Sequence, residues 1–446
     1  MCPPLFTFDN HNIQHARFAS MDFLDNSMQP TAEVPLLAGA RRELVRQLWG
    51  GASYAKLMTK FHLFHPEIHN IPPKKGLPGF AKTKLILSPQ YGLDFDGKYG
   101  VLFHSIPRDL LSSILLGTVA YDSHRNKNIG LDPRGPGVYV LGLQVAGRGG
   151  KFLNAAEYAI LLEDLETYMA VAAKMRAPAG GILTSDEQVF MTAVDHRCGQ
   201  RKAQDRNKPR FIQDDTAHAH AEMVFASLKK RHEALRLMDP ACQAFSVQTP
   251  LYVGCAEKIA TRWVDYDKTD TKTAYQRVNK FLVLVLSLLH HRKIRAQISK
   301  VAAVRIWEKD QLQDAELLVS VLANAYTVQD GFNVQEAGGN NDKLENMPYV
   351  VARSHEYVFA EMPYLRENCD KSADEIEKAQ ALCNTREERL LTQREITGVE
   401  DELQRITALR EEKEAEGSAL REQVQEAIEN LQSLRDIQSQ GAAWKK

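Results

Sequence analysis

The strongest structural signal in this chain is the stretch Pro250-Leu251-Tyr252-Val253-Gly254-Cys255-Ala256. It is a short apolar run that closes on a glycine, as expected of a buried strand. The residues directly after it, Glu257-Lys258-Ile259-Ala260-Thr261-Arg262-Trp263, have the pattern of a helix, and Tyr266 follows one turn beyond Arg262. A strand that passes straight into a helix can bring Tyr252, Arg262 and Tyr266 to a shared edge.

An earlier segment has the same character. It reads Gly135-Pro136-Gly137-Val138-Tyr139-Val140, with glycines, a β-branched residue and then a tyrosine. Two tyrosine-bearing strands beside an arginine-bearing helix suggest a site that cuts phosphodiester bonds, because the planar guanidinium fork binds phosphate oxygens. The competing interpretation is that Tyr139 and Tyr252 are ordinary aromatic residues of a strand core.

The bulk composition is that of a globular protein. The chain has 446 residues, of which 44% are hydrophobic and 25% charged. Because single cores rarely grow beyond about 250 to 300 residues, two or three units are expected. A net charge of −1 excludes a wholly basic, histone-like surface but leaves room for a local basic patch.

Three features favour a soluble intracellular protein, without separating nucleus from cytoplasm. The six cysteines are far apart and form no C-x-x-C pair, so neither zinc nor a disulfide framework is expected. Residues 1–6 lack the basic and apolar regions of a secretory signal. The longest apolar run, Phe281–Leu289, is too short to span a bilayer, so no membrane partner is expected.

The periodicity of the chain predicts an order of elements. Residues 1–95 carry little signal beyond an amphipathic helix at residues 38–49. The further predictions are strands at 101–106, 137–145, 250–254 and 301–307, and helices at 108–116, 154–175, 185–194, 219–237, 256–265, 274–291 and 313–326. Gly117 should stop the helix at 108–116, and Gly338–Asn341 marks a boundary.

A basic stretch lies between the second and third helices of the region at about 150–246. Its cations are Arg197, Arg201, Lys202, Arg206, Lys208 and Arg210, opposed only by Asp205. Such a cluster predicts contacts to the phosphates of nucleic acid. A solvated loop is the other interpretation.

The last part of the chain, residues 371–440, is rich in Glu, Arg, Gln and Leu and contains no proline. A heptad pattern places Ile396, Leu403, Val424 and Leu431 in one seam position, and Val399, Ile406, Leu420, Ala427 and Leu434 in the other. Arg410, Lys413 and Gly417 interrupt it. This spacing predicts a coiled coil that makes a homo-oligomer, with a solvated single helix as the alternative. Residues 346–370 would be a linker.

In order along the chain, these pieces resemble the GIY-YIG nuclease family. Its two signature tripeptides correspond to Gly137-Val138-Tyr139 and Tyr252-Val253-Gly254. The helix arginine of the family corresponds to Arg262, and the His-or-Tyr position four residues later to Tyr266. The glutamate that holds the metal corresponds to Glu316, and the closing asparagine to Asn333. The matches cover residues 130–145 and 248–336.

The resemblance implies a metal-dependent endonuclease that hydrolyses DNA with one Mg²⁺ or Mn²⁺. Tyr139 would orient or deprotonate the attacking water, assisted by Tyr252 or Tyr266, and Arg262 would favour a phenolate or hold a phosphate oxygen. Glu316 would bind the metal and Asn333 would fix the geometry by hydrogen bonding. A carboxylate on the otherwise apolar helix around Glu316 is costly unless it has a partner, which also favours a functional role.

The resemblance also implies the fold. It is an α+β domain at residues 96–345, with a small antiparallel sheet flanked by helices. A helical insertion at about 150–246, a candidate target-recognition subdomain, separates the signatures, and the coiled coil follows. About a hundred residues lie between Tyr139 and Tyr252, where the family has a short hairpin. The interpretation therefore requires that strands 137–139 and 252–254 pair despite the insertion.

Two other functions remain open. One is a non-catalytic assembly or nucleic-acid-binding protein that keeps a degenerate nuclease fold beside its coiled coil. The other is an ADP-ribosyltransferase-like enzyme, in which His104 on a strand and the later Tyr139 would hold nicotinamide dinucleotide. That alternative gives no role to Arg262 or Asn333, and the sequence offers no clear catalytic glutamate for it.

Overall fold

A computed structural model describes residues 39–64, 98–123, 131–177, 181–196, 208–267, 278–308, 310–334, 348–361 and 363–443. The chain forms two compact units, Met1–Ala373 and Asp374–Lys446. The boundary at Gly338–Asn341 that the sequence suggests lies outside the described residues. Each unit is described by itself below.

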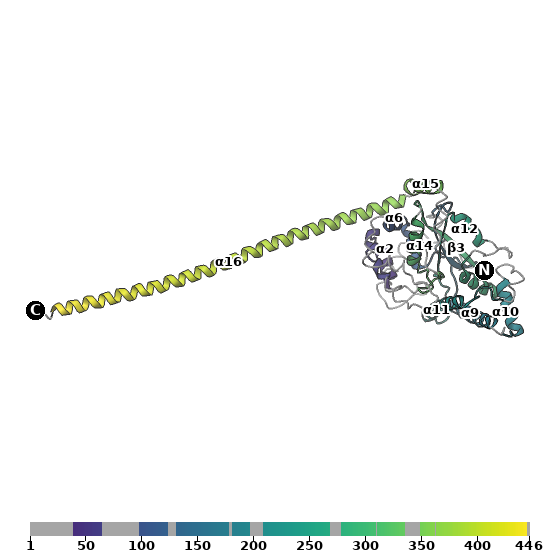
Figure 1. The fold of residues 1–446 in the computed structure, drawn as a ribbon, viewed down its shortest axis with the longest axis horizontal. Helices are drawn as coiled ribbons and strands as arrows, with labels where there is room; N and C mark the ends of the chain where they lie inside the picture. The colour runs from purple at the N-terminus through teal and green to yellow at the C-terminus, as the bar shows by residue number, and fades with distance from the viewer. Residues whose placement is uncertain are drawn as a thin grey trace, which may run out of the picture. The chain divides into compact units, whose positions relative to one another are not determined.

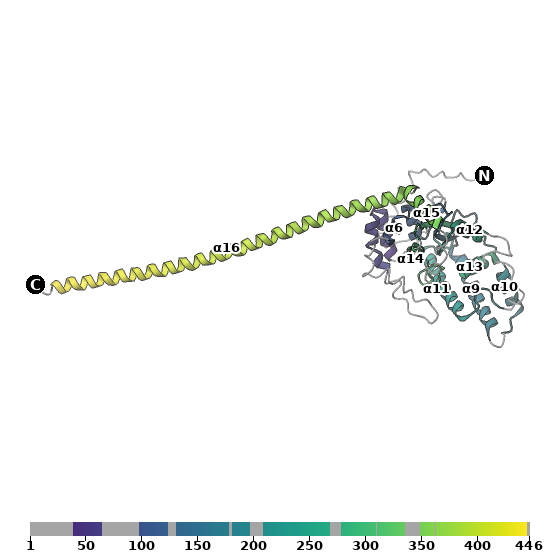
Figure 2. The ribbon, with the colours of Figure 1, turned by 45° about the horizontal axis from the view of Figure 1, so that its top comes forward.

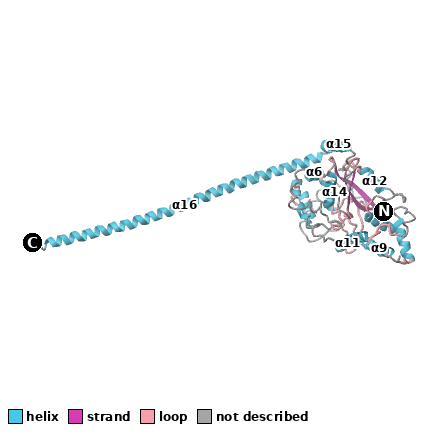
Figure 3. Cartoon of the chain, viewed as in Figure 1, coloured by secondary structure: helices cyan, strands magenta, loops and turns pink. Residues whose placement is uncertain are grey.

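The first unit is built around one antiparallel sheet of three strands, drawn in magenta in Figure 3. The strands are β1 (Gly137–Val145), β2 (Tyr252–Ala256) and β3 (Ala296–Arg305), in the order β2-β1-β3. The central strand β1 is almost wholly buried, which explains its near-continuous apolar sequence. Helices surround the sheet, so the predicted α+β class is confirmed.

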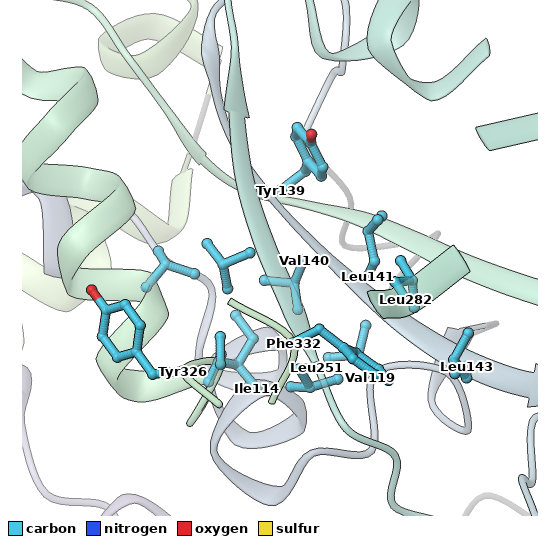
Figure 4. Packing of buried hydrophobic residues seen from close by; sticks show 14 of the residues in the cluster. Ile114, Val119, Tyr139, Val140, Leu141, Leu143, Leu251, Leu282, Tyr326 and Phe332 are labelled. Atoms are coloured by element: carbon cyan, nitrogen blue, oxygen red, sulfur yellow. The ribbon is translucent and has the colours of Figure 1, made fainter. Parts of the chain in front are cut away.

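Helices cover both faces of this sheet. The helix α12 (Ile259–Asp267) and the largely apolar α13 (Lys280–His291) lie on the face toward which Tyr139 and Leu141 point (Figure 4). On the other face are α14 (Gln311–Leu322), α6 (Lys98–His104) and α7 (Arg108–Leu116). Figure 1 shows α6 and α14 on one side of the strands and α12 on the other, and Figure 4 shows Val140 on the side of Tyr326.

Three helices lie between β1 and β2 in the sequence, as the periodicity predicts. They are α9 (Ala155–Arg176), α10 (Ser185–His196) and α11 (Asp215–Met238), which gather together in both Figure 1 and Figure 2. Asn154 and Glu157 form a reciprocal capping box that starts α9. Asp164 of α9 binds Arg292 at the end of α13 through two short hydrogen bonds of 2.6 and 2.8 Å. This ion pair joins the inserted helices to the helix beside the sheet.

The described part of the N-terminal region belongs to the same core. The predicted helix is α2 (Gly39–Trp49), followed by α3 (Tyr54–Met58) and the short η1 (Phe61–Phe64). The phenol of Tyr54 is buried and donates to the Ile106 carbonyl oxygen at 2.6 Å. Residues 1–38 and 65–97 lie outside the described residues.

One predicted strand is wrong, because Val101–Ile106 contributes to the helix α6 and the turn after it. A short apolar run fits a buried helix as well as a strand, and only its length and its neighbours decide between them. Here Leu102 and Phe103 are adjacent in sequence and both completely buried. Alternation could not have produced that pattern on a half-exposed strand. The following helix α7 ends as predicted, with Gly117 at a φ of 73°.

Residues 346–370, expected to be a linker, are helical in their described part and pack on the first unit. They contain α15 (Pro348–Glu356), the π-helical turn η4 (Tyr357–Glu361) and the start of α16 (Pro363–Ala443). The guanidinium of Arg305 donates to Ser354 at 2.9 Å, and the amide of Asn368 donates to the His104 carbonyl oxygen at 2.8 Å. These contacts, and the burial of Val358 and Leu365, involve segments far apart in the sequence, so the local pattern does not predict them.

The second unit consists of the part of α16 from Asp374 onward. The helix α16 has 81 residues and is uninterrupted (Figure 2). From Asp374 onward its described apolar side chains are exposed, for example Val399 at 70% and Leu403 at 64%. Among the described helices of the whole chain, none is long and apolar enough to cross a membrane.

Candidate functional site

The two tyrosine-bearing segments lie on neighbouring strands of one sheet, despite the helices between them. Tyr139 of β1 is directly opposite Gly254 of β2 and, on its other side, opposite Ala302 of β3. Leu141 is opposite Tyr252. Because directly opposed residues of paired strands share a face, the side chains of Tyr139 and Tyr252 belong to the same face of the sheet.

Because glycine has no side chain, the glycines of these two segments leave room for neighbouring side chains to lie close to the backbone of the sheet. A Cβ placed on Gly254 would lie 2.5 Å from the hydroxyl oxygen of Tyr139 and 3.0 Å from the ring of Tyr252. A Cβ on Gly137 would meet the carbonyl oxygen of Val304 and the side chain of Ile259. Gly254 thus leaves the space that the phenol of Tyr139 occupies.

The phenols of Tyr139 and Tyr266 hydrogen-bond each other at 2.8 Å. Tyr139 is only 1% exposed and Tyr266 4%, and their rings meet edge to face. Burial raises the pKa of both phenols. The hydrogen bond with Tyr266 raises the pKa of Tyr139 further, whereas the bond with Tyr139 and the nearby Arg262 act to lower the pKa of Tyr266. Either phenol can be the donor in this hydrogen bond.

Arg262 holds a positive charge beside these phenols. Its guanidinium carbon is 5.6 Å from the centre of the Tyr266 ring, and its Nη1 is 3.2 Å from a carboxylate oxygen of Asp265. Burial acts to lower the pKa of Arg262, but the phenols of Tyr266, Tyr139 and Tyr252 outweigh it and raise the pKa. Arg262 is therefore always charged, and it supplies the positive field that a phenolate needs.

Glu316 reaches the same strand from the helix on the other face of the sheet. Its carboxylate accepts a hydrogen bond from the thiol of Cys255, the residue after Gly254. Burial and then Glu316 raise the pKa of that thiol well above its ordinary value. Burial, Tyr266 and Glu316 raise the pKa of Tyr252, while Arg262 opposes them. Residues 252–255 thus lie in the fields of both Glu316 and Arg262.

Asn333 supports the outer edge of β2. Its side-chain oxygen accepts from the Val253 backbone N–H at 3.0 Å, and its side-chain nitrogen donates to the Val253 carbonyl oxygen at 2.9 Å. Because β2 is an edge strand, those two backbone groups face away from β1 and need partners when buried. Asn333 supplies both and so fixes the position of Tyr252 and Gly254.

Glu316 is the residue that the sequence suggests for a divalent cation. It is a half-buried carboxylate close to β2, and Mg²⁺ commonly binds one or two carboxylates together with water and phosphate oxygens. Within the described residues, no group of three or more His, Cys, Asp or Glu side chains could hold a metal by itself. A metal at Glu316 therefore stays a prediction.

The basic stretch is only partly described. Arg197, Arg201, Lys202 and Arg206 lie outside the described residues, and Lys208 is exposed. Arg210 has an internal role, because its guanidinium donates to the Asp195 carbonyl oxygen at 3.0 Å and lies over the ring of Phe211. The prediction of phosphate contacts therefore weakens for Arg210 and stays a prediction for the others.

His104, the residue on which the ADP-ribosyltransferase alternative depends, belongs to a helix and not to a strand. Its ring is buried, with Nδ1 at 2.6 Å from the Gly100 carbonyl oxygen and Nε2 at 2.8 Å from the hydroxyl of Ser372. Both ring nitrogens therefore have partners inside the protein, as in a structural histidine. This geometry does not favour a nucleotide site at His104.

The sequence interpretation gave no role to Cys255 or Asp265, although both contact the candidate site. Asp265 lies three residues after Arg262, a spacing at which helical side chains meet, so its ion pair could have been foreseen. The role of Cys255 could not have been foreseen, because its hydrogen bond with Glu316 joins residues about sixty positions apart.

The structure brings together Tyr139, Tyr252, Arg262 and Tyr266, whereas Glu316 approaches β2 from α14 on the other face of the sheet and Asn333 binds the outer edge of β2. Comparison of the chain with models of protein families, with curated proteins and with solved structures gives no significant match.

Proposed function

We propose that this chain is an endonuclease that hydrolyses phosphodiester bonds of DNA in the manner of the GIY-YIG nucleases, with Mg²⁺ or Mn²⁺. The observation that supports it most is the pairing of Tyr139 with Gly254 across two strands separated by a long helical insertion. It supports the proposal because it joins two segments, each informative by itself, beside Arg262, with Glu316 close to the same edge strand. Ordinary core packing would not require an arginine between buried phenols.

In the proposed reaction, water loses a proton to the phenol pair. Tyr139 takes the proton from water as it passes its own proton to a phenolate on Tyr266, which the positive charge of Arg262 stabilises. The hydroxide attacks phosphorus, the bond to the leaving oxygen breaks, and that oxygen takes a proton from solvent. The 2.8 Å distance between the two phenol oxygens is short enough for this transfer.

Negative charge develops on the phosphate oxygens during attack and must be neutralised. Arg262 can hold one of these oxygens because it stays charged when buried. Glu316 would hold the divalent cation, which polarises the phosphate and offsets the charge of the leaving oxygen. Asn333 touches neither substrate nor cation in this proposal, since it positions β2 through the backbone of Val253.

The test uses Glu316→Gln and Arg262→Lys in the full chain, with Glu308→Gln as a matched control. Glu308 is an exposed carboxylate just before the start of α14. Conversion of supercoiled plasmid in Mg²⁺ should fall by about 100-fold or more in both site variants and stay unchanged in the control. Mn²⁺ binding, measured by electron paramagnetic resonance, should be lost in Glu316→Gln alone.

The two variants also separate the proposal from a binding protein with a degenerate nuclease fold. Burial of Tyr139 and Tyr266 is the feature that favours such a protein, because a buried phenol pair can be purely structural. A wild-type chain that binds DNA and never cuts it, with any of several divalent metals, would establish that alternative. Equal cutting by the wild type and both site variants would refute the site.

A further inference from the structure

The helix α16 carries one apolar stripe, which we call the seam. Its members are Ile396, Val399, Leu403, Ile406, Arg410, Lys413, Gly417, Leu420, Val424, Ala427, Leu431 and Leu434. They repeat at alternating steps of three and four residues over about five heptads, which is enough for a stable coiled coil. Several apolar members are more than half exposed, including Leu420 at 62%. A helix with such a stripe needs a partner that covers it.

We infer that this partner is a second copy of the chain, bound antiparallel, with the two-fold axis near residue 415 of each helix. The inference does not depend on the proposed nuclease activity. It depends on the positions of Arg410, Lys413 and Gly417 near the middle of the seam, with apolar members on both sides of them.

The outer layers of the seam pair apolar residues with apolar residues in this arrangement. In an antiparallel pair the two seam positions face each other, so residues whose numbers are symmetric about 415 meet. Ile396 then meets Leu434, Val399 meets Leu431, Leu403 meets Ala427 and Ile406 meets Val424. Each of these layers occurs twice, once on either side of the axis.

The centre of the seam explains why the antiparallel orientation is favoured. In a parallel pair, Arg410 would face its own copy, as would Lys413, with like charges in two successive layers. In the antiparallel pair, Arg410 faces Leu420 and Lys413 faces Gly417, where the absence of a side chain leaves room for the lysine stem. The aliphatic stems can pack while their charged ends reach water and the carboxylates nearby.

Those carboxylates are already in place on the helix itself. Arg410 is paired with Glu414 at 2.8 Å and Lys413 with Glu416 at 2.6 Å. Each cation can therefore keep a partner within its own helix while its stem lies against the other copy. Two exposed pairs of this kind contribute little stability by themselves, so their role would be orientation rather than affinity.

The register is also selected by the sequence. A shift that puts Arg410 opposite Lys413 brings two cations together. The opposite shift by one heptad puts Ile396 opposite Gly441 and Val399 opposite Gln438, which removes two apolar layers. Of these three registers, only the one centred near residue 415 keeps all four outer apolar layers and brings no two cations together.

The orientation of the two helices determines how far apart the Asp374 residues of the two copies lie. At a rise of 1.5 Å per residue, the two Asp374 residues of an antiparallel pair would be about 120 Å apart. In a parallel pair they would be about 10 Å apart.

The test is disulfide cross-linking of full-length chains that carry one added cysteine each. Leu403→Cys chains mixed with Ala427→Cys chains should cross-link under mild oxidation, with peptides joined from 403 to 427 identified by mass spectrometry. Leu403→Cys chains mixed with Leu420→Cys chains form the matched control, because that pair reports the register shifted by one heptad. Light scattering should give about twice the 50.2 kDa of the chain.

Each possible result is decisive. Efficient joining of 403 to 427, with little joining in the control, supports the inference. Joining of 403 to 403 would show a parallel pair, and preferential joining of 403 to 420 would show another register. A mass of one chain at micromolar concentration would show that α16 does not bind its own copy. Any of the last three results overturns the inference.

Discussion

The phenol of Tyr139 combines two properties that bear directly on its proposed role. It is almost completely buried, and its hydrogen-bond partner is another phenol at 2.8 Å. Burial and the neighbouring Tyr266 and Tyr252 raise its pKa well above the ordinary value, while Arg262 acts in the other direction. At neutral pH the pair is therefore almost entirely protonated, and only a small fraction is ready to accept a proton.

The rate of DNA cleavage should depend on pH, because only the ionised fraction of the phenol pair can accept a proton. Because the pKa of both phenols is raised, the phenolate population should grow about tenfold for each pH unit below that pKa. The value of kcat/KM for DNA cleavage should therefore rise with a slope near one from pH 7 to pH 9, without a plateau. The Tyr139→Phe and Tyr266→Phe variants should each lose this slope and cut at least 100-fold more slowly at pH 9.

The control is Tyr121→Phe, since Tyr121 is 43% exposed. Its profile should match that of the wild type. A bell-shaped wild-type profile centred near pH 7 would indicate a different base. Retention of the full slope in Tyr139→Phe would assign the ionisation to another group, such as the attacking water.

A second prediction at the scale of single residues concerns the room that Gly254 leaves for the phenol of Tyr139. In Gly254→Ala the new Cβ would lie 2.5 Å from the Tyr139 hydroxyl oxygen, so the phenol must move. The cost should be about 1–3 kcal/mol of unfolding free energy, as for other overpacked sites. Tyr139→Ala removes the obstacle, so urea unfolding of the double variant should show a cost well below the sum of the two single variants.

If the losses of unfolding free energy in Gly254→Ala and Tyr139→Ala simply added in the double variant, the strain would not come from contact between these two residues. Gly398→Ala is the matched control, because a Cβ at Gly398 meets nothing within 4 Å in the helix α16. It should be neutral or raise helix stability by up to about 1 kcal/mol.

At the level of elements, the edge strand β2 depends on one side chain. Asn333→Ala removes the partners of both Val253 backbone groups, and Val253 is completely buried. Two unsatisfied buried groups should lower the unfolding free energy by about 2–4 kcal/mol. Since Tyr252 and Gly254 flank Val253, cleavage should fall together with stability, as measured by urea unfolding and plasmid conversion.

Asn384→Ala is a suitable comparison, because Asn384 is exposed on α16 and should change stability by less than about 0.5 kcal/mol. If Asn333→Ala were as stable and as active as Asn384→Ala, the two hydrogen bonds would have no positioning role.

The elements that sequence predicts well are those whose pattern has a single physical interpretation. The strands at Tyr139 and Tyr252 and the helix of Arg262 each combine periodicity with a glycine or a cap, and the structure contains all three. The strand predicted at residues 101–106 was wrong because the short apolar run Val101-Leu102-Phe103 carries no period that separates a strand from a helix. The helices at 348–361 were missed because their contacts, such as Arg305 with Ser354, join segments that are far apart in the sequence.

At the scale of the whole molecule, the chain divides within α16. Before the division, Leu365 and Asn368 are buried, and the Ser372 hydroxyl bonds both the His104 ring and the Ala55 backbone N–H. After it, nearly every described side chain is exposed. Heptad spacing without proline predicts a helix in the second part, which the structure contains, because repeated spacing is a local property. The coiled coil itself stays a prediction. The first turns of α16 were assigned partly to a linker. Only their tertiary contacts distinguish them from the rest of the helix, and the sequence does not show such contacts.

This division predicts the outcome of two truncations. A chain that ends after Asp374 keeps the contacts of Leu365, Asn368 and Ser372, so it should melt near the full-length temperature. A chain that ends after Glu361 loses an apolar side chain from the core and leaves the His104 and Ile106 carbonyl oxygens without the Asn368 amide. Its first unit should lose at least about 2 kcal/mol of unfolding free energy. Circular dichroism at several temperatures would measure both.

The two truncated chains also separate the roles of the two parts of α16. The chain ending after Asp374 lacks the whole seam, so it should be a monomer by light scattering while it still cuts plasmid DNA in Mg²⁺. Ser372→Ala in the full chain is the matched variant. It removes the bonds to His104 and Ala55 but leaves the seam intact, so it should stay a dimer and lose about 1–2 kcal/mol of stability. Equal melting temperatures for both truncations would contradict this assignment, because they would show that residues 363–373 do not stabilise the first unit.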